Sequence, residues 1–355
     1  MTTALRRNLR LGLVTAVVAY AALLRFDAIS QQYDAVATPR WLSVLQRSRA
    51  GPSVLRPSAV QWTAWPLFPH REGPPTQYRS DPYTYLQRAR QMHSFYEAHL
   101  REPLFPFTTK IALWLLDNQD VAVSAASAWF SILAVFGTFV LGAMAFSDAI
   151  GLGAALLLAV EYEVITVGTQ GWRDDAFTAA VVWCSVAVIA FARRPSRGRA
   201  ILLGALAAAA CLVRITAISF LVPAWLWIAW TANADLRLRV GHLAFGTVIA
   251  VALVTPYLVN CWSAFGDPFY SINAHAAAYQ VTENPSDAMP SSAAEYLTSH
   301  VIRRPFRTID TAAMGMTAYP FSNKWVGFDP WGRRIGLVLS WTSLAGLTLF
   351  TLRST

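Results

Sequence analysis

The chain has 355 residues, of which 55% are hydrophobic and only 14% are charged, and it contains 14 tryptophans. Its mean hydropathy of +0.38 excludes an ordinary soluble domain and indicates a polytopic membrane protein. The net charge of +9 does not indicate nucleic acid, because nearly all of it is arginine and part of that arginine flanks apolar segments. We therefore expect an all-α polytopic membrane protein whose partners include the lipid bilayer and no nucleic acid.

About eight apolar stretches are long enough, or nearly so, to cross a hydrocarbon core of about 30 Å. They lie at 9–26, 121–146, 149–167, 175–192, 200–214, 215–231, 241–260 and 335–352. The fifth and sixth are contiguous, so they form either a hairpin or one bent segment. We divide the chain into a transmembrane core at 1–260, an outer loop at 261–334, and a last span with the C-terminus at 335–355.

Arginine clusters predict the orientation of these spans. One cluster precedes the first span, one fills the connection between the fourth and fifth, and one precedes the seventh (Arg6, Arg7, Arg10; Arg193, Arg194, Arg197, Arg199; Arg237, Arg239). By the positive-inside rule all three are cytoplasmic, and the loops 27–120, 168–174 and 261–334 then face outward. The first span also fits a cleavable signal peptide. We favour an uncleaved anchor, because Arg25-Phe26-Asp27 follows directly as an interfacial boundary.

Acidic residues stand beside the spans on the predicted outer side. Asp27 closes the first span, Asp81 opens an aromatic-rich segment of the first outer loop, and Asp174 and Asp175 lie between the third and fourth spans. Carboxylates next to hydrocarbon are costly, which makes these residues candidates for function.

The first outer loop carries two predicted interfacial helices. Asp81 followed by Pro82 predicts a helix start, and we expect this helix to run to about Leu100, before Glu102-Pro103 ends it. Its face with Tyr85, Met92 and Tyr96 suits the membrane interface. A second helix is expected from about 106 to 116, and neither helix is long enough to span.

Three short motifs, in this order after a first span, carry a family resemblance. They are Asp81-Pro82-Tyr83, Glu102-Pro103-Leu104-Phe105-Pro106 and Arg173-Asp174-Asp175-Ala176-Phe177. Together they resemble the GT-C superfamily of membrane glycosyltransferases over roughly residues 9–231, above all its bacterial protein-mannosyltransferase-like and aminoarabinose-transferase-like members. The Asp-Pro-aromatic start is also similar to the oligosaccharyltransferase catalytic subunit, although Gln87 stands where that subunit has an arginine and Arg88 follows.

The resemblance implies a GT-C-like bundle that performs an inverting sugar transfer. The donor would be a polyprenyl-phosphate-linked sugar, and the acceptor a lipid, glycan or protein on the outer face of the membrane. Such a reaction needs a base for the acceptor proton, cations for the departing phosphate, and aromatic side chains for the sugar and the lipid. The family style also implies a bacterial inner membrane, with the site facing the periplasm or exterior.

Asp81 is the first candidate for the base, because it is expected at the interface where a membrane-bound donor meets its acceptor. The alternative is that Asp81 only caps its helix. Asp27 is the second candidate, because several branches of the superfamily place the functional acid soon after the first span. Its alternative is a boundary residue paired with Arg25.

The second acidic turn is expected to bind substrate. Either Asp174 or Asp175 caps the fourth span, and the match of Asp175-Ala176-Phe177 to the family pattern puts Asp175 in the cavity, as a ligand for donor, acceptor or a divalent metal. A metal would need Asp81 and Asp175 to converge with further oxygen ligands. Arg173 either contributes to this site or neutralises the two acids.

Glu161 is expected about 18 Å into the third span, and Glu163 on nearly the opposite helix face. Either the span unwinds there or one of the two has an arginine partner. Arg214 is the candidate partner of Glu161, and equally a candidate ligand for the carrier phosphate, which a guanidinium suits.

Tyr85, Arg88 and His275 complete the predicted substrate-binding residues. His275 ends the segment 266–275, which resembles one found in some bacterial members of the superfamily, and it is either a donor to phosphate or a solvated loop residue. Two other classes of function stay open. One is a transporter or lipid flippase, with Glu161, Glu163 and Arg214 as translocation groups, and the other is a non-catalytic relative.

Overall fold

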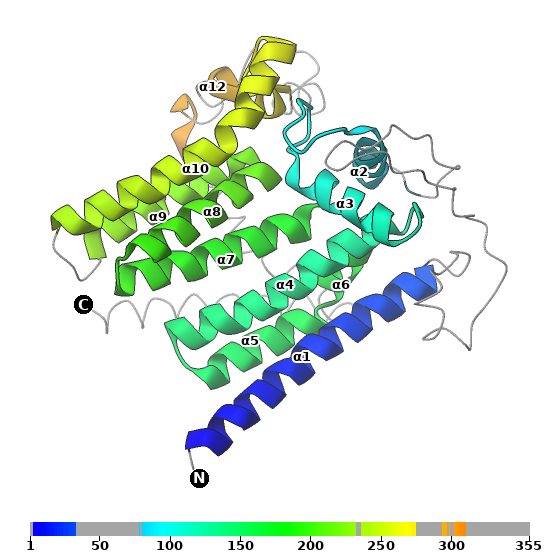
Figure 1. Ribbon diagram of the computed structural model, residues 1–355, viewed down its shortest axis with the longest axis vertical. Coiled ribbons are helices and arrows are strands. Elements are labelled where there is room, and N and C mark those ends of the chain that lie inside the picture. The colour runs from blue at the N-terminus through cyan, green and yellow to red at the C-terminus, as the bar shows by residue number, and fades with distance from the viewer. Residues whose placement is uncertain are drawn as a thin grey trace. The chain divides into compact units, whose positions relative to one another are not determined.

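The computed structural model describes residues 3–32, 78, 80–231, 236–274, 293–296, 298 and 302–309 (Figure 1). These residues are 84% helical and contain no strand. The prediction of an all-α membrane protein is therefore confirmed.

From α3 to α10 the helices follow one another with short connections, whereas twelve residues separate α2 from α3. Their bounds are α1 Thr3–Gln32, α2 Ser80–Gln91, α3 Leu104–Leu115, α4 Ala122–Ala145, α5 Asp148–Val160, α6 Tyr162–Thr169, α7 Asp174–Arg193, α8 Arg197–Val213, the 3-10 helix η1 Ile215–Ala217, α9 Ile218–Thr231, α10 Leu236–Phe265 and α12 Ala293–Tyr296.

Four of the described helices are long and apolar enough to cross a membrane, and the span count of eight is not confirmed. The four segments are Asn8–Ile29, Ala122–Ala145, Asp174–Arg193 and Leu236–Phe265. Three predicted spans correspond to shorter helices. The third span corresponds to α5 and α6, the fifth to α8, and the sixth to η1 and α9. The predicted eighth span at 335–352 lies outside the described residues. The contiguous fifth and sixth spans are separate helices, because the chain is extended at Arg214 between them.

The chain divides into two units, which are described separately. The larger holds Met1–Val160 with Val164–Ser271, and the smaller holds Glu161–Glu163 with Ile272–Thr355. In the larger unit α4 packs against α1, α5 and α7, and α8 packs against α7 and α10. In the smaller unit Arg303, Arg304 and Arg307 are exposed.

Small residues bring two of these helix pairs together. A Cβ atom added at Gly142 would lie 2.7 Å from the Cα of Gly151, so α4 and α5 touch through their backbones. A Cβ added at Gly246 of α10 would lie 2.8 Å from the carbonyl oxygen of Ala200 in α8. Such close approaches need glycine, and they fix how these helices pack.

The larger unit has two distinct ends. In Figure 1 the start of α1 and the α4–α5 and α7–α8 turns lie at one end, and α2 and α3 lie at the other. Arg193 at the end of α7 donates a hydrogen bond to the carbonyl oxygen of Met144 at the end of α4, which ties two elements together at the first end. The alternation of helices therefore separates the arginine-rich turn between α7 and α8 from the segment that carries Asp81.

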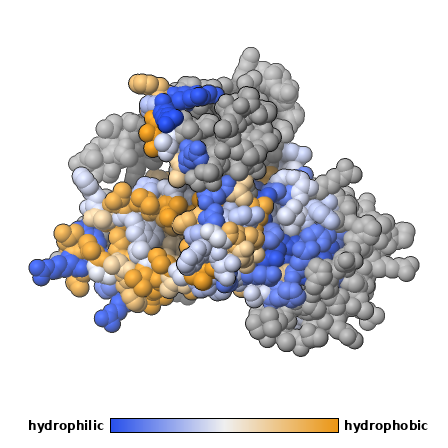
Figure 2. Space-filling view, turned by 90° about the horizontal axis from the view of Figure 1, so that it is seen from above, coloured by the Kyte–Doolittle hydropathy of each residue, from blue (hydrophilic) through white to orange (hydrophobic). Residues whose placement is uncertain are grey.

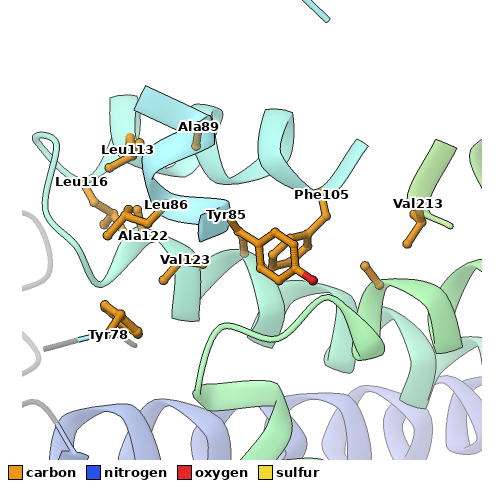
Figure 3. Close-up of a cluster of buried hydrophobic side chains, with 12 residues drawn as sticks. Tyr78, Tyr85, Leu86, Ala89, Phe105, Leu113, Leu116, Ala122, Val123 and Val213 are labelled. Carbon is orange, nitrogen blue, oxygen red and sulfur yellow. The ribbon is translucent and has the colours of Figure 1, made fainter. Parts of the chain in front are cut away.

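The helix that Asp81 opens differs from its prediction in two respects. It ends at Gln91, well before Leu100. Its apolar face does not lie open for the membrane interface: Tyr85 and Leu86 are buried in a cluster with Phe105 of α3 and Val123 of α4 (Figure 3). The helix predicted at about 106–116 is confirmed as α3.

Apolar side chains are exposed along the long helices, for example Leu23 of α1, Trp129 of α4 and Val248 of α10. Figure 2 shows hydrophobic residues over much of the visible described surface, with hydrophilic patches between them. Such a surface is expected where side chains face lipid instead of water.

Candidate active site

Asp81 lies in the first turn of α2 and is held by side chains. Arg101 Nη2 donates to its Oδ1 at 2.6 Å, and the Tyr85 hydroxyl donates to its Oδ2 at 3.1 Å. Among the described residues no backbone N–H donates to this carboxylate, so helix capping does not account for its contacts. The Asp81 side chain is 32% exposed, so the carboxylate is partly accessible.

Tyr85 connects this carboxylate to two arginines. Its ring packs edge-on against Phe105, with ring centroids 5.1 Å apart (Figure 3), and the guanidinium carbons of Arg101 and Arg173 lie 5.6 and 5.9 Å from its centroid. Burial raises the pKa of Tyr85 far above its usual value, although the charges of Arg173 and Arg101 oppose this shift. The hydroxyl therefore stays protonated at neutral pH and remains a donor to Asp81.

Glu102 accepts hydrogen bonds from three donors in the protein interior. It follows Arg101 in the connection between α2 and α3, and its side chain is 2% exposed. Arg173 Nη1 donates to its Oε2 at 2.5 Å, while the Ile215 N–H and the Ser271 hydroxyl donate to its Oε1 at 3.0 and 2.8 Å. Burial alone would lower the pKa of Arg173, but the charge of Glu102 raises it, so the Arg173 guanidinium stays charged.

Arg214 and Asp174 form a second, more accessible ion pair. Arg214 Nη2 donates to Asp174 Oδ1 at 3.2 Å, and the guanidinium lies 5.3 Å from the ring centroid of Phe177. Their side chains are 32% and 48% exposed. Partly exposed ion pairs of this kind contribute little to stability.

The turn before α7 is anchored to α4. Ser127 donates to the carbonyl oxygen of Trp172 at 2.7 Å, and Arg173 follows as the N-cap residue of α7, without a side-chain cap bond. Neither acid is that N-cap residue, so the predicted capping role is wrong; Asp174 and Asp175 instead fill the first turn, where negative charge is favourable.

Asp175 is buried, in contrast to Asp174. A Cβ atom added at Gly168 of α6 would lie 2.9 Å from Ser131 Oγ and 3.1 Å from Asp175 Oδ2, so the acid packs between α6 and α4. Arg25 Nε donates to the same Ser131 hydroxyl at 2.8 Å. A role for Asp175 in substrate binding stays a prediction.

The structure places the remaining predicted residues as follows. Asp27 is exposed on α1, inside a helix that continues to Gln32. Arg88 is buried and donates to Glu97, with Nη1 3.4 Å from Oε1 and Nη2 3.3 Å from the carbonyl oxygen. Glu161 is buried where the chain breaks between α5 and α6, which agrees with an unwound span. His275 lies outside the described residues.

A metal was one alternative for the acids. Within the described parts of the chain no group of three or more His, Cys, Asp or Glu side chains comes together. The ion pairs that Asp81, Glu102 and Asp174 form are each with an arginine guanidinium.

Three residues of this region were not predicted from the sequence as parts of a site. They are Arg101, Glu102 and Ser271. Glu102 was interpreted as a helix stop and as part of a family motif, without a role in the site, and its partners at 173, 215 and 271 lie far along the chain. The resemblance of the segment at 266–275 to some bacterial members of the superfamily was the one signal that pointed toward Ser271.

One comparison with known proteins gives a match to the central part of the chain. Residues 100–260 match the family model of dolichyl-phosphate-mannose-protein mannosyltransferases. This stretch contains Arg101, Glu102, Arg173 and Arg214, and it begins after Asp81 and Tyr85. A search of curated proteins finds no match. On an all-helical membrane fold, the match over residues 100–260 confirms the resemblance to the GT-C mannosyltransferase family that the sequence indicated.

Proposed function

We propose that this membrane glycosyltransferase of the GT-C type transfers a sugar, with inversion, from a polyprenyl-phosphate carrier to a lipid, glycan or protein acceptor. The observation that carries the proposal is one set of linked charges: an accessible carboxylate, Asp81, joined through Arg101, Tyr85 and Arg173 to the turn that presents Arg214. The site would face the periplasm or exterior of a bacterial inner membrane.

In the proposed reaction the carboxylate and the phosphate have separate roles. An acceptor hydroxyl attacks the anomeric carbon of the sugar from the face opposite the phosphate, and its proton passes to a carboxylate oxygen of Asp81. The bond between the anomeric carbon and the phosphate oxygen breaks, and its electron pair leaves on the carrier phosphate. Attack opposite the leaving group inverts the anomeric centre.

Asp81 suits the role of base because it is both accessible and oriented. Arg101 and Tyr85 bind its two oxygens separately, at 2.6 and 3.1 Å, which fixes the plane of the carboxylate. A base in a fixed position contributes about 10²- to 10⁴-fold to the rate.

Arg214 suits the role of the cation for the departing phosphate. A guanidinium matches two phosphate oxygens in a plane, and this one is bound only to the exposed Asp174 and the face of Phe177 among the described residues. A phosphate with two negative charges would compete well against a single exposed carboxylate.

A membrane transporter or lipid flippase is the second candidate, and one observation favours it. Arg25 is fully buried within the apolar segment Asn8–Ile29, where it donates to Ser131 Oγ and to the carbonyl oxygens of Ala21 and Ala159. Ionisable residues inside membrane spans often mark transport pathways. Transport sites, however, usually lie near the midplane between repeated halves, and the linked charges here lie at one end of the bundle.

The direct test is sugar transfer by the purified protein in proteoliposomes. The family description names mannose on dolichyl phosphate, so radiolabelled polyprenyl-phosphate-mannose is the first donor, followed by other polyprenyl-phosphate sugars with an envelope extract as acceptor. We expect a labelled product together with free polyprenyl phosphate. Movement of intact donor between leaflets, with no transfer from any donor, would instead support the flippase.

A further inference from the structure

Glu102 is the point where four distant segments of the larger unit meet. It lies between α2 and α3, and its three donors come from the turn before α7, from the break after α8 and from the segment after α10 (Arg173, Ile215 and Ser271). Both carboxylate oxygens are occupied, and the side chain is almost fully buried. Removing such a carboxylate would leave buried donors without an acceptor, which is costly.

One of these bonds supports the break that carries Arg214. The chain leaves α8 at Val213, is extended at Arg214 with φ −155° and ψ 111°, and turns into η1 at Ile215. The first N–H groups of a helix have no partner within it, and a negative charge there is favourable. Glu102 accepts the N–H of Ile215 at 3.0 Å, so it stabilises the helix start next to Arg214 from a distant part of the chain.

A second hydrogen bond to Glu102, from Arg173, keeps Arg173 in the interior and leaves Arg214 as the accessible arginine. Arg173 is 6% exposed and donates to Glu102 and to the carbonyl oxygen of Val213. Its charge is therefore neutralised inside the protein. Arg214, the neighbour of Val213, stays at the surface with 32% exposure.

We propose that Glu102 is a positioning residue for the carrier phosphate, because it sequesters Arg173 and fixes the extended turn from which Arg214 reaches that phosphate. The proposal rests on the proposed function, in which Arg214 binds the phosphate. Glu102 itself touches neither donor nor acceptor.

Equilibrium binding tests this role without any transfer reaction. The probe is a short-chain polyprenyl phosphate, and the polyprenol of equal length is the control ligand. The variants are Glu102→Gln, Arg214→Gln and the two combined, measured in the same detergent. We expect each single variant to weaken phosphate binding about tenfold and to leave polyprenol binding unchanged.

The combined variant separates positioning from an independent effect. If Glu102 acts through Arg214, the double variant binds no more than about twofold more weakly than Arg214→Gln alone, because the cation that Glu102 positions is already absent. Losses that multiply to about a hundredfold would overturn the proposal, as would wild-type binding by Glu102→Gln.

A matched variant controls for lost stability. Arg90 and Asp120 form another buried ion pair of the same unit, with both side chains fully buried. Asp120→Asn should lower the thermal midpoint as Glu102→Gln does, and leave the affinity for polyprenyl phosphate unchanged. Weakened binding in Asp120→Asn to the same degree would show that any destabilisation suffices, and would overturn the role of Glu102.

Three further outcomes are decisive. If Glu102→Gln does not fold, Ser271→Ala removes one donor to the same carboxylate, and weaker phosphate binding by that variant supports the proposal while unchanged binding overturns it. If the wild-type protein binds polyprenyl phosphate no better than polyprenol, the proposed donor is wrong and the role of Glu102 with it. Phosphate-dependent binding that Glu102→Gln leaves intact would reject the role of Glu102 alone.

Discussion

Tyr85 contacts Asp81, Arg101 and the buried Arg173. Its hydroxyl donates to Asp81 at 3.1 Å, and its ring lies against Arg101 and Arg173. Tyr85→Phe keeps the ring and removes only the donor. A hydrogen bond to a charged group contributes about 1.5–3 kcal/mol, so we expect the initial rate of transfer to fall about tenfold or more. Tyr83→Phe, on the exposed side of the same helix, is the matched control and should keep the wild-type rate; equal rates for both variants would remove Tyr85 from the site.

His99 makes the stability of the protein dependent on pH. Burial, and then the charges of Arg88 and Arg101, lower the pKa of His99 from 6.5 to about 4, and its Nδ1 accepts the N–H of Arg101 at 3.1 Å. In the unfolded chain His99 binds a proton below about pH 6.5. The unfolded state therefore gains protons as the pH falls from 6.5 to 4, and stability decreases over that window.

His99→Asn tests this dependence. Asparagine offers an acceptor oxygen to the Arg101 N–H but does not titrate. We expect the thermal midpoint of the variant to fall less than that of the wild type between pH 6.5 and 4.5. Parallel decreases in both proteins would mean that His99 does not contribute.

At the scale of elements, the contact between α8 and α10 depends on glycine. A Cβ atom at Gly204 would overlap the carbonyl oxygen of Gly246 and lie 3.0 Å from Ile249 Cβ, so Gly204→Ala must push the two helices apart. Overpacking of this kind costs about 1–3 kcal/mol. We expect a lower thermal midpoint for Gly204→Ala.

Gly198, in the same helix, is the matched control for that substitution. Nothing lies within 4 Å of a Cβ atom added there. Alanine is the better helix former by about 1 kcal/mol, so Gly198→Ala should leave the midpoint unchanged or raise it. A midpoint for Gly204→Ala that equals that of Gly198→Ala would show that the two helices do not pack as closely as described.

The end of α2 shows where a sequence pattern fails. No glycine or proline stands between Gln91 and Leu100, and the apolar spacing predicts a helix over that stretch. Tertiary bonds compete with the helix there: the carbonyl oxygens of Tyr96 and His99 accept from Asn260 and Tyr257 of α10. Hydrogen bonds to a helix more than 150 residues away leave no local signal in the sequence. The hydrogen bonds of Glu102 to distant residues likewise leave no local signal.

The whole molecule was easier to predict from its sequence than its site. Long uninterrupted apolar runs require helices in a membrane, so α4, α7 and α10 lie close to the predicted spans at 121–146, 175–192 and 241–260. The third span is broken at Glu161, which is one of the two alternatives that the glutamates left open. In contrast, the ion pair of Asp81 with Arg101 could not be foreseen, because it depends on how the connection from α2 to α3 folds back.

The orientation of the bundle predicts opposite accessibility for its two ends. The three native cysteines, Cys184, Cys211 and Cys261, are buried, so background labelling should be low. Gln91 and Gly198 are exposed, at the end of α2 and at the start of α8. If the α2 end faces outward, a membrane-impermeant thiol reagent labels Gln91→Cys in intact cells and Gly198→Cys only after permeabilisation. The opposite pattern would place the proposed site in the cytoplasm.

The most direct test of the proposed function compares two aspartates from the part of the chain between α1 and α4. Asp81→Asn removes the proton acceptor, whereas Asp117→Asn changes an exposed acid in the connection between α3 and α4, at a positive φ that asparagine also tolerates. With equal amounts of protein and polyprenyl-phosphate-sugar donor, we predict that Asp81→Asn lowers the initial rate of transfer at least a hundredfold and that Asp117→Asn retains it. Transfer by Asp81→Asn at the wild-type rate would contradict the account and turn the search for the base to Asp27.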